Sequence, residues 1–184
     1  MQDKPSITIL HRTDGSDVRI GKMCRSLSRM GFSVNFIGWD REPQKTKKID
    51  LGDTDLDVLN LVTKNGRSTI LGTLRYIIYC YLAILKKRPQ ILCTVNEDLT
   101  LAFVPFRLLT KTKLVCDIFD PIDDRNSHKA FPFRWGAKTV AFLSRSLSHR
   151  LIATDKNRKK RLGRFGKKAI VIENMPEDPG PDLC

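Results

Sequence analysis

Short apolar runs alternate with longer helix-like segments along most of the chain, and this alternation limits the possible folds more than any other feature. Seven runs have the length and apolar content of buried β-strands: residues 6–10, 32–39, 58–62, 91–95, 113–119, 150–154 and 169–173. Helices are expected at residues 18–30, 68–87, 99–109 and 131–148 and after the N-cap residue Asp155. Strands that alternate with helices pair in parallel, because each helix returns the chain to the same edge of the sheet. The fold class is therefore predicted as α/β, with a doubly wound, mainly parallel sheet in a single domain.

The longest helical segment, residues 68–87, is expected to pack one apolar face against the core. The residues of that face recur at helical spacing: Leu71, Leu74, Ile78, Tyr81, Leu82 and Leu85. The uninterrupted apolar part, residues 76–85, is only half of the roughly 20 residues that a bilayer span requires. A core helix is therefore the better interpretation than a membrane span.

Two segments have the composition of connections. Residues 41–54 are polar and charged, which predicts a surface loop. Residues 174–184 contain three prolines and one glycine, a composition typical of linkers. We therefore expect one domain over residues 1–173 and the start of an interdomain linker at residues 174–184, with a second domain absent. The opening "MQDKPSITIL" has too short an apolar run for a signal peptide.

The net charge indicates which classes of partner the protein binds, and the cysteines indicate its cellular compartment. The 184 residues include 33 Lys and Arg against 20 Asp and Glu, a net charge of +13, which favours nucleic acid, anionic lipid head groups or phosphorylated substrates. The five cysteines are scattered and form no CxxC pair, so no metal site is predicted. Reduced, mostly buried thiols indicate a cytoplasmic protein.

The loop "HRTDGSDVRIGK", residues 11–22, follows the first predicted strand, where a parallel sheet binds its ligands. It has one glycine, Gly15, so the dinucleotide fingerprint GxGxxG is missing and an NAD enzyme is not expected. Arg19 and Lys22 in the first turns of the following helix favour an anion at its N-terminus. Alternatively, Asp14, Ser16 or Asp17 simply caps the helix. His11 is a weaker candidate, because a neutral imidazole often only satisfies a backbone carbonyl.

Acidic residues follow two later strands. Asp117 and Asp120 lie at or just after the fifth predicted strand, where paired carboxylates orient hydroxyl groups or bind a divalent cation. Asp123 and Asp124 further along fit a solvated turn better. Glu97 and Asp98 come after the fourth predicted strand and are two further acidic candidates at the end of a strand.

A basic run and an aromatic helix suggest surface contacts. Residues 156–168 hold eight basic residues and no acid, which favours an anionic membrane surface or, by the same Coulomb attraction, nucleic acid. Phe165 is the run's one aromatic, so a stacking platform for single strands is poorly supported and nucleic acid is the weaker interpretation. A solvated basic face is the third alternative. The helix at 131–148 is either interfacial or an ordinary core helix.

One long segment resembles a known family. The stretch "SDVRIGKMCRSLSRMGFSVNFIGWDR" is similar to the opening of family 4 glycosyltransferases of the GT-B fold, in register and without a gap. The later segments "EDLTL", "KLVCD", "LIATD" and "VIENMP" resemble motifs of that family in the same order. Glu97 and Phe119 depart from it, because many members carry His at those two places.

The resemblance implies the Rossmann-like N-terminal half of a two-domain enzyme. Such an enzyme transfers a hexosyl group with retention from a nucleotide-sugar to a saccharide or lipid-linked acceptor, without a cofactor. The C-terminal domain, in cis or on a separate chain, would bind the donor, so this chain alone is expected to be inactive. A peripheral position at the inner face of the membrane is also expected. The implied catalytic candidates are Glu97, Asp98 and Asp117, and the implied cleft residues for donor phosphate or acceptor are His11, Gly15, Ser16, Arg19, Lys22 and Asp120. The competing interpretation is a non-catalytic basic α/β module that binds membranes or nucleic acid.

Overall fold

The computed structural model describes residues 4–42, 51–61 and 69–173. Its strands are β1 (Ser6–Leu10), β2 (Ser33–Asp40), β3 (Thr54–Asn60), β4 (Ile91–Val95), β5 (Lys113–Ile118), β6 (Arg150–Ala153) and β7 (Ala169–Val171). Its helices are α1 (Val18–Arg29), α2 (Ile70–Lys87), α3 (Glu97–Leu109), α4 (Ile122–Arg125), α5 (Phe131–Leu147) and α6 (Lys156–Arg161), and a 3₁₀ segment covers Gly163–Lys168. The predicted linker at 174–184 lies outside the described residues.

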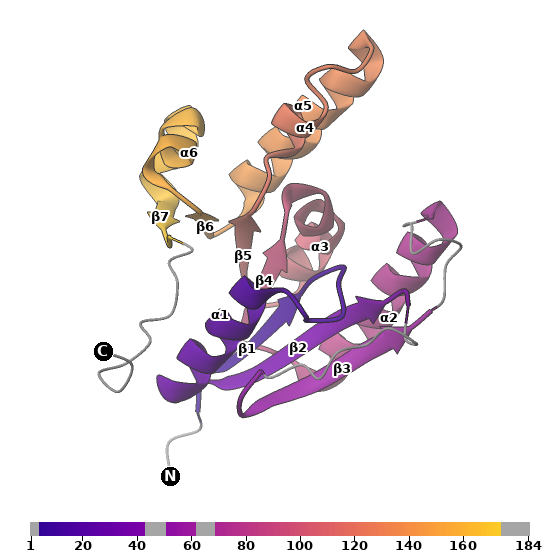
Figure 1. Cartoon of the computed structure of the whole chain (residues 1–184), viewed down its shortest axis with the longest axis vertical. Helices are drawn as coiled ribbons and strands as arrows, with labels where there is room; N and C mark the ends of the chain where they lie inside the picture. Colours follow the sequence, from indigo (N-terminus) through magenta and orange to yellow (C-terminus); the bar gives the residue numbers. More distant parts are fainter. Residues whose placement is uncertain (1–3, 43–50, 62–68, 174–184) are drawn as a thin grey trace, which may run out of the picture.

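The seven strands form one sheet in the order β3-β2-β1-β4-β5-β6-β7, and every neighbouring pair is parallel (Figure 1). The α/β prediction with a mainly parallel sheet is therefore confirmed. Because all strands point the same way, their carboxyl ends share one edge. The strand order reverses between β1 and β4, the position at which open α/β sheets bind ligands.

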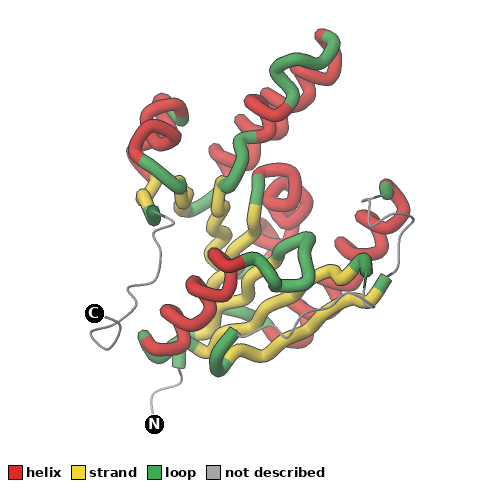
Figure 2. Tube along the Cα trace, viewed as in Figure 1, coloured by secondary structure: helices red, strands yellow, loops and turns green. Residues whose placement is uncertain are grey.

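The two faces of the sheet are covered by different helices. On one face, Ile9 and Phe36 pack with Ile20 and Cys24 of α1. On the other face, residues such as Leu10 pack with α2 and α3, and α5 lies along α3. Figure 2 shows α5 extending past the carboxyl ends of the strands. Ile9 and Leu10 are neighbours in β1 that serve opposite cores, as the two-residue period of a strand requires.

The third strand differs from its prediction. It was expected at residues 58–62, after a surface loop at 41–54, but it covers Thr54–Asn60. It pairs with β2 from Val34–Thr54 to Asp40–Asn60. β3 is an edge strand, so its side chains are only partly covered and Asp55 and Asp57 are tolerated within it. Residues 43–50 of the expected loop, and residue 62, lie outside the described residues.

The orientation of α2 corrects a second prediction. The residues that face the core are Gly72, Tyr76, Cys80 and Ile84. The expected core residues Leu71, Leu74, Ile78, Leu82 and Leu85 are instead 59%, 52%, 60%, 65% and 55% exposed. Two contacts set this orientation. The Tyr76 hydroxyl donates to the carbonyl oxygens of His11 and Ile37, and the Trp39 ring stacks on Tyr76 close to Gly72.

None of the helices in the described part of the chain combines the length and apolarity needed to cross a membrane. The four cysteines within the described residues are free, and their burial confirms that prediction: Cys24, Cys80, Cys93 and Cys116.

Candidate functional site

The carboxyl edge of the sheet collects the segments that hold the predicted site residues. His11, Gly15 and Ser16 follow β1, and Arg19 and Lys22 lie in the first turns of α1. The acidic candidates come from the neighbouring strands: Glu97 and Asp98 open α3 after β4, and Asp117 and Asp120 lie at the end of β5 or just after it. The parallel topology therefore brings the candidates to one side of the molecule.

The loop between β1 and α1 is held by its own side chains. The Asp17 carboxylate accepts hydrogen bonds from the amides of Arg19 and Ile20, and Asp14 accepts from the amide and hydroxyl of Ser16. Gly15 has φ +94°, in the left-handed region that favours glycine. Asp17 thus caps α1, one of the two alternatives that the sequence left open. The amides of Arg19 and Ile20 already donate to Asp17, so they are not free to bind an anion. An anion at this helix end would be bound by side chains of the loop and the helix.

Arg19 and Asp117 form a buried ion pair at the centre of this edge. Arg19 Nη2 donates to Asp117 Oδ1 at 2.8 Å, and the guanidinium lies 4.5 Å from the centroid of the Phe119 ring. Burial raises the pKa of Asp117 to about 7, although the positive charge of Arg19 acts in the opposite direction. Within the described residues, Arg19 Nη1 and Asp117 Oδ2 have no hydrogen-bond partner. Buried polar atoms are rarely left unpaired, so this pair has spare capacity for a polar ligand or water.

Two cavities meet at Arg19. One, of about 300 Å³, is lined by Asp17, Arg19, Phe119, Asp120, Thr154 and Arg158. The other, of about 340 Å³, includes Arg19, Lys22 and Asp117 together with apolar residues of α1 and Ile172. Arg158 donates to the Phe119 carbonyl oxygen and lies 3.5 Å from Asp120 Oδ1. Arg158 and Phe119 were not predicted as site residues. For Arg158, nothing in the basic run distinguishes it from its neighbours.

Glu97 and Asp98 are adjacent in sequence but differ in their surroundings. The Glu97 carboxylate is fully buried; its Oε1 lies 2.6 Å from Arg145 Nε, and its Oε2 accepts from the amide of Ile122 at 2.7 Å. Burial raises its pKa. These bonds join α3 to α4 and α5. Asp98 is more accessible and pairs with Arg12, with Arg125 Nη2 at 3.8 Å. Of the two carboxylates, Asp98 is the one that a ligand can reach.

His11 is a buried, uncharged side chain. Burial lowers its pKa to about 4, so the imidazole is neutral at physiological pH. Its Nδ1 lies 2.7 Å from Thr13 Oγ1, and its ring packs against Phe119. His11 therefore supplies no positive charge for a phosphate.

Asn96 links the ends of β4 and β5, a role that no sequence pattern indicates. Its Oδ1 accepts hydrogen bonds from the amides of Phe119 and Asp120, both at 3.2 Å. Its φ of +69° and ψ of 154° lie in a region that is almost restricted to glycine. The strained backbone and the two bonds fix the loop after β5 next to the start of α3.

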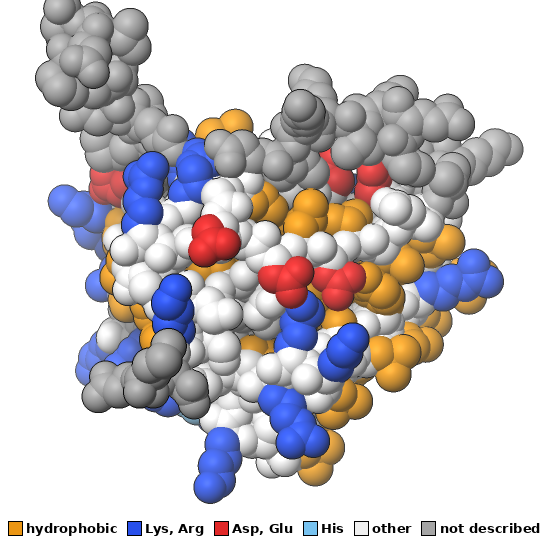
Figure 3. Space-filling model, turned by 90° about the horizontal axis from the view of Figure 1, so that it is seen from below, with side chains coloured by type: hydrophobic (Ala, Val, Ile, Leu, Met, Phe, Trp, Pro, Cys, Tyr) orange, Lys and Arg blue, Asp and Glu red, His pale blue; other side chains and the backbone are white. Residues whose placement is uncertain are grey.

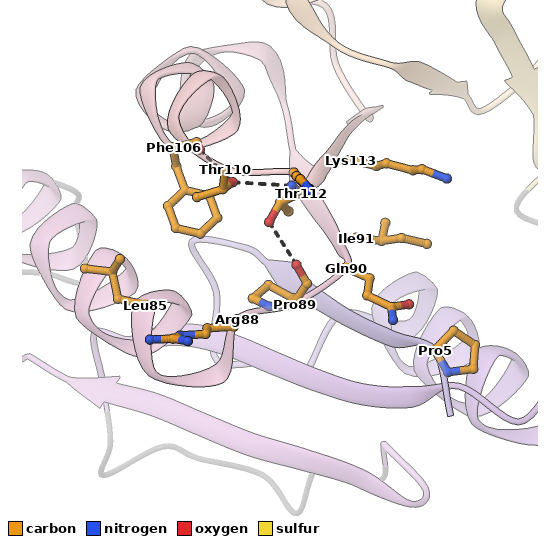
Figure 4. A pocket seen from close by; sticks show the side chains of 11 residues that line it. Pro5, Leu85, Arg88, Pro89, Gln90, Ile91, Phe106, Thr110, Thr112 and Lys113 are labelled. Atoms are coloured by element: carbon orange, nitrogen blue, oxygen red, sulfur yellow. Dashed lines mark hydrogen bonds between the residues drawn. The ribbon is translucent and has the colours of Figure 1, made fainter. Parts of the chain in front are cut away.

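A cavity of about 790 Å³ lies at the opposite edge, where the strands begin (Figure 4). Pro5 precedes β1 there, and Ile91 and Lys113 open β4 and β5. It is therefore separate from the candidate site.

No protein-family model and no curated protein matches the sequence. Several solved structures match the fold. Sucrose-phosphate synthase from Thermosynechococcus elongatus is similar with a TM-score of 0.71 at 12% identity, over 92% of this chain and 48% of that one. A UDP-N-acetylglucosamine 2-epimerase matches with a TM-score of 0.63 at 10% identity, over 92% and 48% of the two chains. Arabidopsis thaliana UGT89C1, solved with UDP-L-rhamnose, matches with a TM-score of 0.61 at 9% identity, over 97% and 54%.

These identities establish the fold alone. The chain spans about half the length of the solved structures that it matches. Those structures are glycosyltransferases of the GT-B fold and an epimerase that shares it. The chain therefore has the fold of one Rossmann-like half of a GT-B protein.

Proposed function

We propose that the chain is the acceptor-side half of a glycosyltransferase that moves a sugar from a nucleotide-sugar to a saccharide or lipid-linked acceptor. The glycosyltransferase fold of its structural neighbours supports this proposal, as does the UDP-sugar bound to one of them. The resemblance to family 4 adds a hexosyl donor and retention of configuration. The second Rossmann-like domain, in cis or on a separate chain, completes the cleft.

The Arg19–Asp117 pair at the carboxyl edge carries the proposal. When a sugar leaves its nucleotide, negative charge develops on the departing diphosphate, and fixed cations nearby stabilise the transition state. Arg19 has an unbonded Nη1 and lines both cavities, so it is the cation best placed to meet that charge. Arg158, and Lys22 on the next turn of α1, add positive charge to the two cavity walls.

The acidic residues divide into two roles in this proposal. Asp98 and Asp120 are accessible and accept hydrogen bonds from acceptor hydroxyls. Glu97 is a positioning residue, because both of its oxygens are bonded within the protein and hold α3, α4 and α5 together. Asp117 positions Arg19 through the bond between Arg19 Nη2 and Asp117 Oδ1.

A transfer assay with the isolated chain and with its completed form tests the proposal. The chain is incubated with a panel of radiolabelled nucleotide-sugars and lipid-linked saccharides, first alone and then with the polypeptide that co-purifies with it or is encoded downstream. We expect no transfer by the chain alone and clear transfer by the completed form. Arg19→Met should lower the completed form's kcat by about 100-fold, the loss typical for removal of one hydrogen-bond donor that stabilises developing negative charge.

Arg29→Met is the matched control, because Arg29 is an exposed arginine in the last turn of the same helix. It should leave transfer unchanged. Robust transfer by the chain alone would refute the need for a second domain. Unchanged kcat in the Arg19→Met form would remove the proposed role of the carboxyl edge.

A further inference from the structure

The cavity at the amino edge of the sheet is fixed by hydrogen bonds between its walls. Its volume of about 790 Å³ lies in the range of sites that bury a small molecule. Thr112 Oγ1 donates to the Pro89 carbonyl oxygen at 2.9 Å and so joins the start of β5 to the connection between α2 and β4. The Lys113 amide donates to the Gln90 carbonyl oxygen at 2.9 Å, and the Gln90 amide donates to Ser6 Oγ at 3.1 Å. The cavity is therefore preformed, so a ligand does not have to order it.

Apolar side chains form a large part of the cavity wall. They are Pro5, Leu85, Pro89, Ile91 and Phe106, and Figure 4 shows them around the cavity. Phe106 is only 5% exposed and Pro89 is buried, so both belong to the interior side of the wall. Small-molecule sites combine an apolar wall with a few polar groups that fix the orientation of the ligand. This wall therefore suits a ligand with an apolar body.

The charged residues in the wall are all positive: Arg88, Lys111 and Lys113. Arg88 follows α2, whereas the two lysines flank Thr112 where β5 starts, and Figure 4 shows Arg88 and Lys113 on different sides of the cavity. In the described part of the chain, none of these three cations forms an ion pair. Their charges are therefore available to an anionic group of a ligand.

The surface around the cavity adds to this positive charge. Figure 3 shows the molecule from below, the side on which most strands begin in Figure 1. Lys and Arg side chains stand out over the lower part of that view, and no Asp or Glu side chain is visible among them. A hollow that is lined by charges of one sign concentrates counter-ions, so this edge of the sheet favours anions.

We propose that the cavity binds a small organic anion, a molecule that joins an apolar ring-sized body to a carboxylate or phosphate group. The apolar body lies against Phe106 and Pro89. The anionic group lies beside the side chains of Arg88, Lys111 and Lys113, since lysine and arginine bind both kinds of anion. The cavity is at the opposite edge from Arg19, so this inference goes beyond the proposed function and does not depend on it.

Both parts of the ligand are required by the composition of the wall. An inorganic anion would pair with the cations and leave the apolar side chains uncovered. An uncharged apolar molecule would cover those side chains and leave the three cations without a partner. A ligand that carries both parts should therefore bind more tightly than either part alone.

Isothermal titration calorimetry with the full chain and four probes tests the proposal. The probes are naphthoate, naphthyl phosphate, the uncharged naphthylmethanol and inorganic phosphate. We expect saturable binding of the two organic anions, at least about tenfold tighter than that of naphthylmethanol, because one charge-assisted hydrogen bond contributes about that factor. Inorganic phosphate at the same concentration should not displace them. The tighter of the two organic anions shows which anionic group the site prefers.

Two variants remove cations from the cavity wall. Lys111→Gln/Lys113→Gln should weaken binding of the organic anions by about tenfold or more. Arg88→Gly should also weaken binding, and it should keep or raise the stability of the protein, because Arg88 has φ +44°, in the left-handed region that favours glycine. Weaker binding by this variant therefore cannot be attributed to unfolding, which a thermal melt checks.

The matched control is Lys156→Gln/Lys160→Gln, which removes two exposed lysines of α6 that do not line the cavity. It should bind the organic anions like the unaltered chain. A second readout locates the ligand: in amide NMR spectra, naphthoate should shift the signals of Gln90 and Thr112 and leave those of Arg19 and Asp117 in place.

Several results would overturn the proposal. They are no binding of either organic anion, equal binding of naphthylmethanol, displacement by inorganic phosphate, or unchanged binding in both cavity variants. An equal loss in the α6 control would mean that only the net charge of the protein matters. Loss of binding in Arg19→Met, with shifts at Arg19 and Asp117, would place the anion at the carboxyl edge instead.

Discussion

Asp117 and His11 are buried titratable side chains at the same edge of the sheet, and burial moves their pKa values in opposite directions. The pKa of Asp117 rises from 3.8 to about 7, so the folded protein holds a proton that the unfolded chain releases. The pKa of His11 falls from 6.5 to about 4, so the unfolded chain holds a proton that the folded protein lacks. Between pH 4 and 6.5 the two effects on stability cancel.

Substitution of either residue should reveal the effect of the other. In Asp117→Asn, the effect of His11 is no longer offset, and relative to the unaltered chain the free energy of unfolding should rise from about pH 4 to 6.5. In His11→Asn, the effect of Asp117 is no longer offset, and relative to the unaltered chain the free energy of unfolding should fall from about pH 4 to 6.5. Each slope is at most about 1.4 kcal/mol per pH unit. Urea unfolding at a series of pH values measures both.

The unaltered chain serves as the reference for these slopes. Its stability should vary least of the three proteins between pH 4 and 6.5. Parallel pH profiles for all three proteins would show that neither group titrates differently in the folded and unfolded states.

A second prediction concerns the buried carboxylate of Glu97. Arg145→Met removes its charged partner and should destabilise the protein by about 3 kcal/mol at neutral pH, because a buried charge is left unpaired. Arg145 also holds Asp123 through two hydrogen bonds, which adds to the loss. The double variant Glu97→Gln/Arg145→Met should recover part of it. Urea unfolding is the measurement.

Arg134→Met on the exposed side of α5 is the matched control and should change stability little. A loss for Arg145→Met no larger than that of the control would mean that Glu97 is not held by this pair.

The sequence position of the site residues was predictable, but their contacts with residues distant in the chain were not. The candidates follow strands in the sequence, and the parallel topology brings them to one edge of the sheet. The sequence could not show that Glu97 is closed off and Asp98 accessible, because that depends on Arg145 and Ile122, which are distant in the chain. Arg158 was missed for the same reason: its partners Phe119 and Asp120 are far from it in sequence.

At the scale of elements, α2 shows what periodicity can and cannot predict. The apolar pattern located the helix at 68–87, and the helix covers Ile70–Lys87. The pattern could not identify the buried face, because both faces of α2 are apolar. The choice is made by Tyr76, which bonds two carbonyls of the sheet, and by Gly72, which leaves space for Trp39.

Two glycines in different helices provide the third prediction. A Cβ at Gly72 would lie 2.8 Å from two atoms of the buried Trp39 ring, so Gly72→Ala should destabilise by about 1–3 kcal/mol through overpacking. A Cβ at Gly136 in α5 meets nothing within 4 Å. Gly136→Ala should therefore stabilise by about 0.5–1 kcal/mol, the helix-propensity gain. Thermal unfolding distinguishes the two signs. Equal effects would mean that the packing of α2 on Trp39 does not determine its orientation.

At the scale of the whole molecule, the order of the strands sets where stability is concentrated. β1 and β4 lie in the middle of the sheet, paired on both sides. Leu10 and Leu92 contribute to the core under α2 and α3, and Ile9 and Cys93 to the core under α1. The far end is smaller: β6 and the three-residue strand β7 pack around a separate cluster with Leu162. Local opening should therefore begin at the β6–β7 end.

Hydrogen exchange read by mass spectrometry tests this ordering and connects it to the site. Amides of β1 and β4 should exchange last, and those of β7 well before them. Thr154 and Arg158 lie at the weak end and line the cavity that Arg19 shares, so a diphosphate bound there would tie this end to α1. Inorganic pyrophosphate should therefore slow exchange in β6 and α6 more than in β3, the edge strand at the other end of the sheet. If pyrophosphate slowed exchange in β3 to the same extent, the effect would be a general one of salt. If all strands exchanged at the same rate without pyrophosphate, the expected gradient of stability would be contradicted.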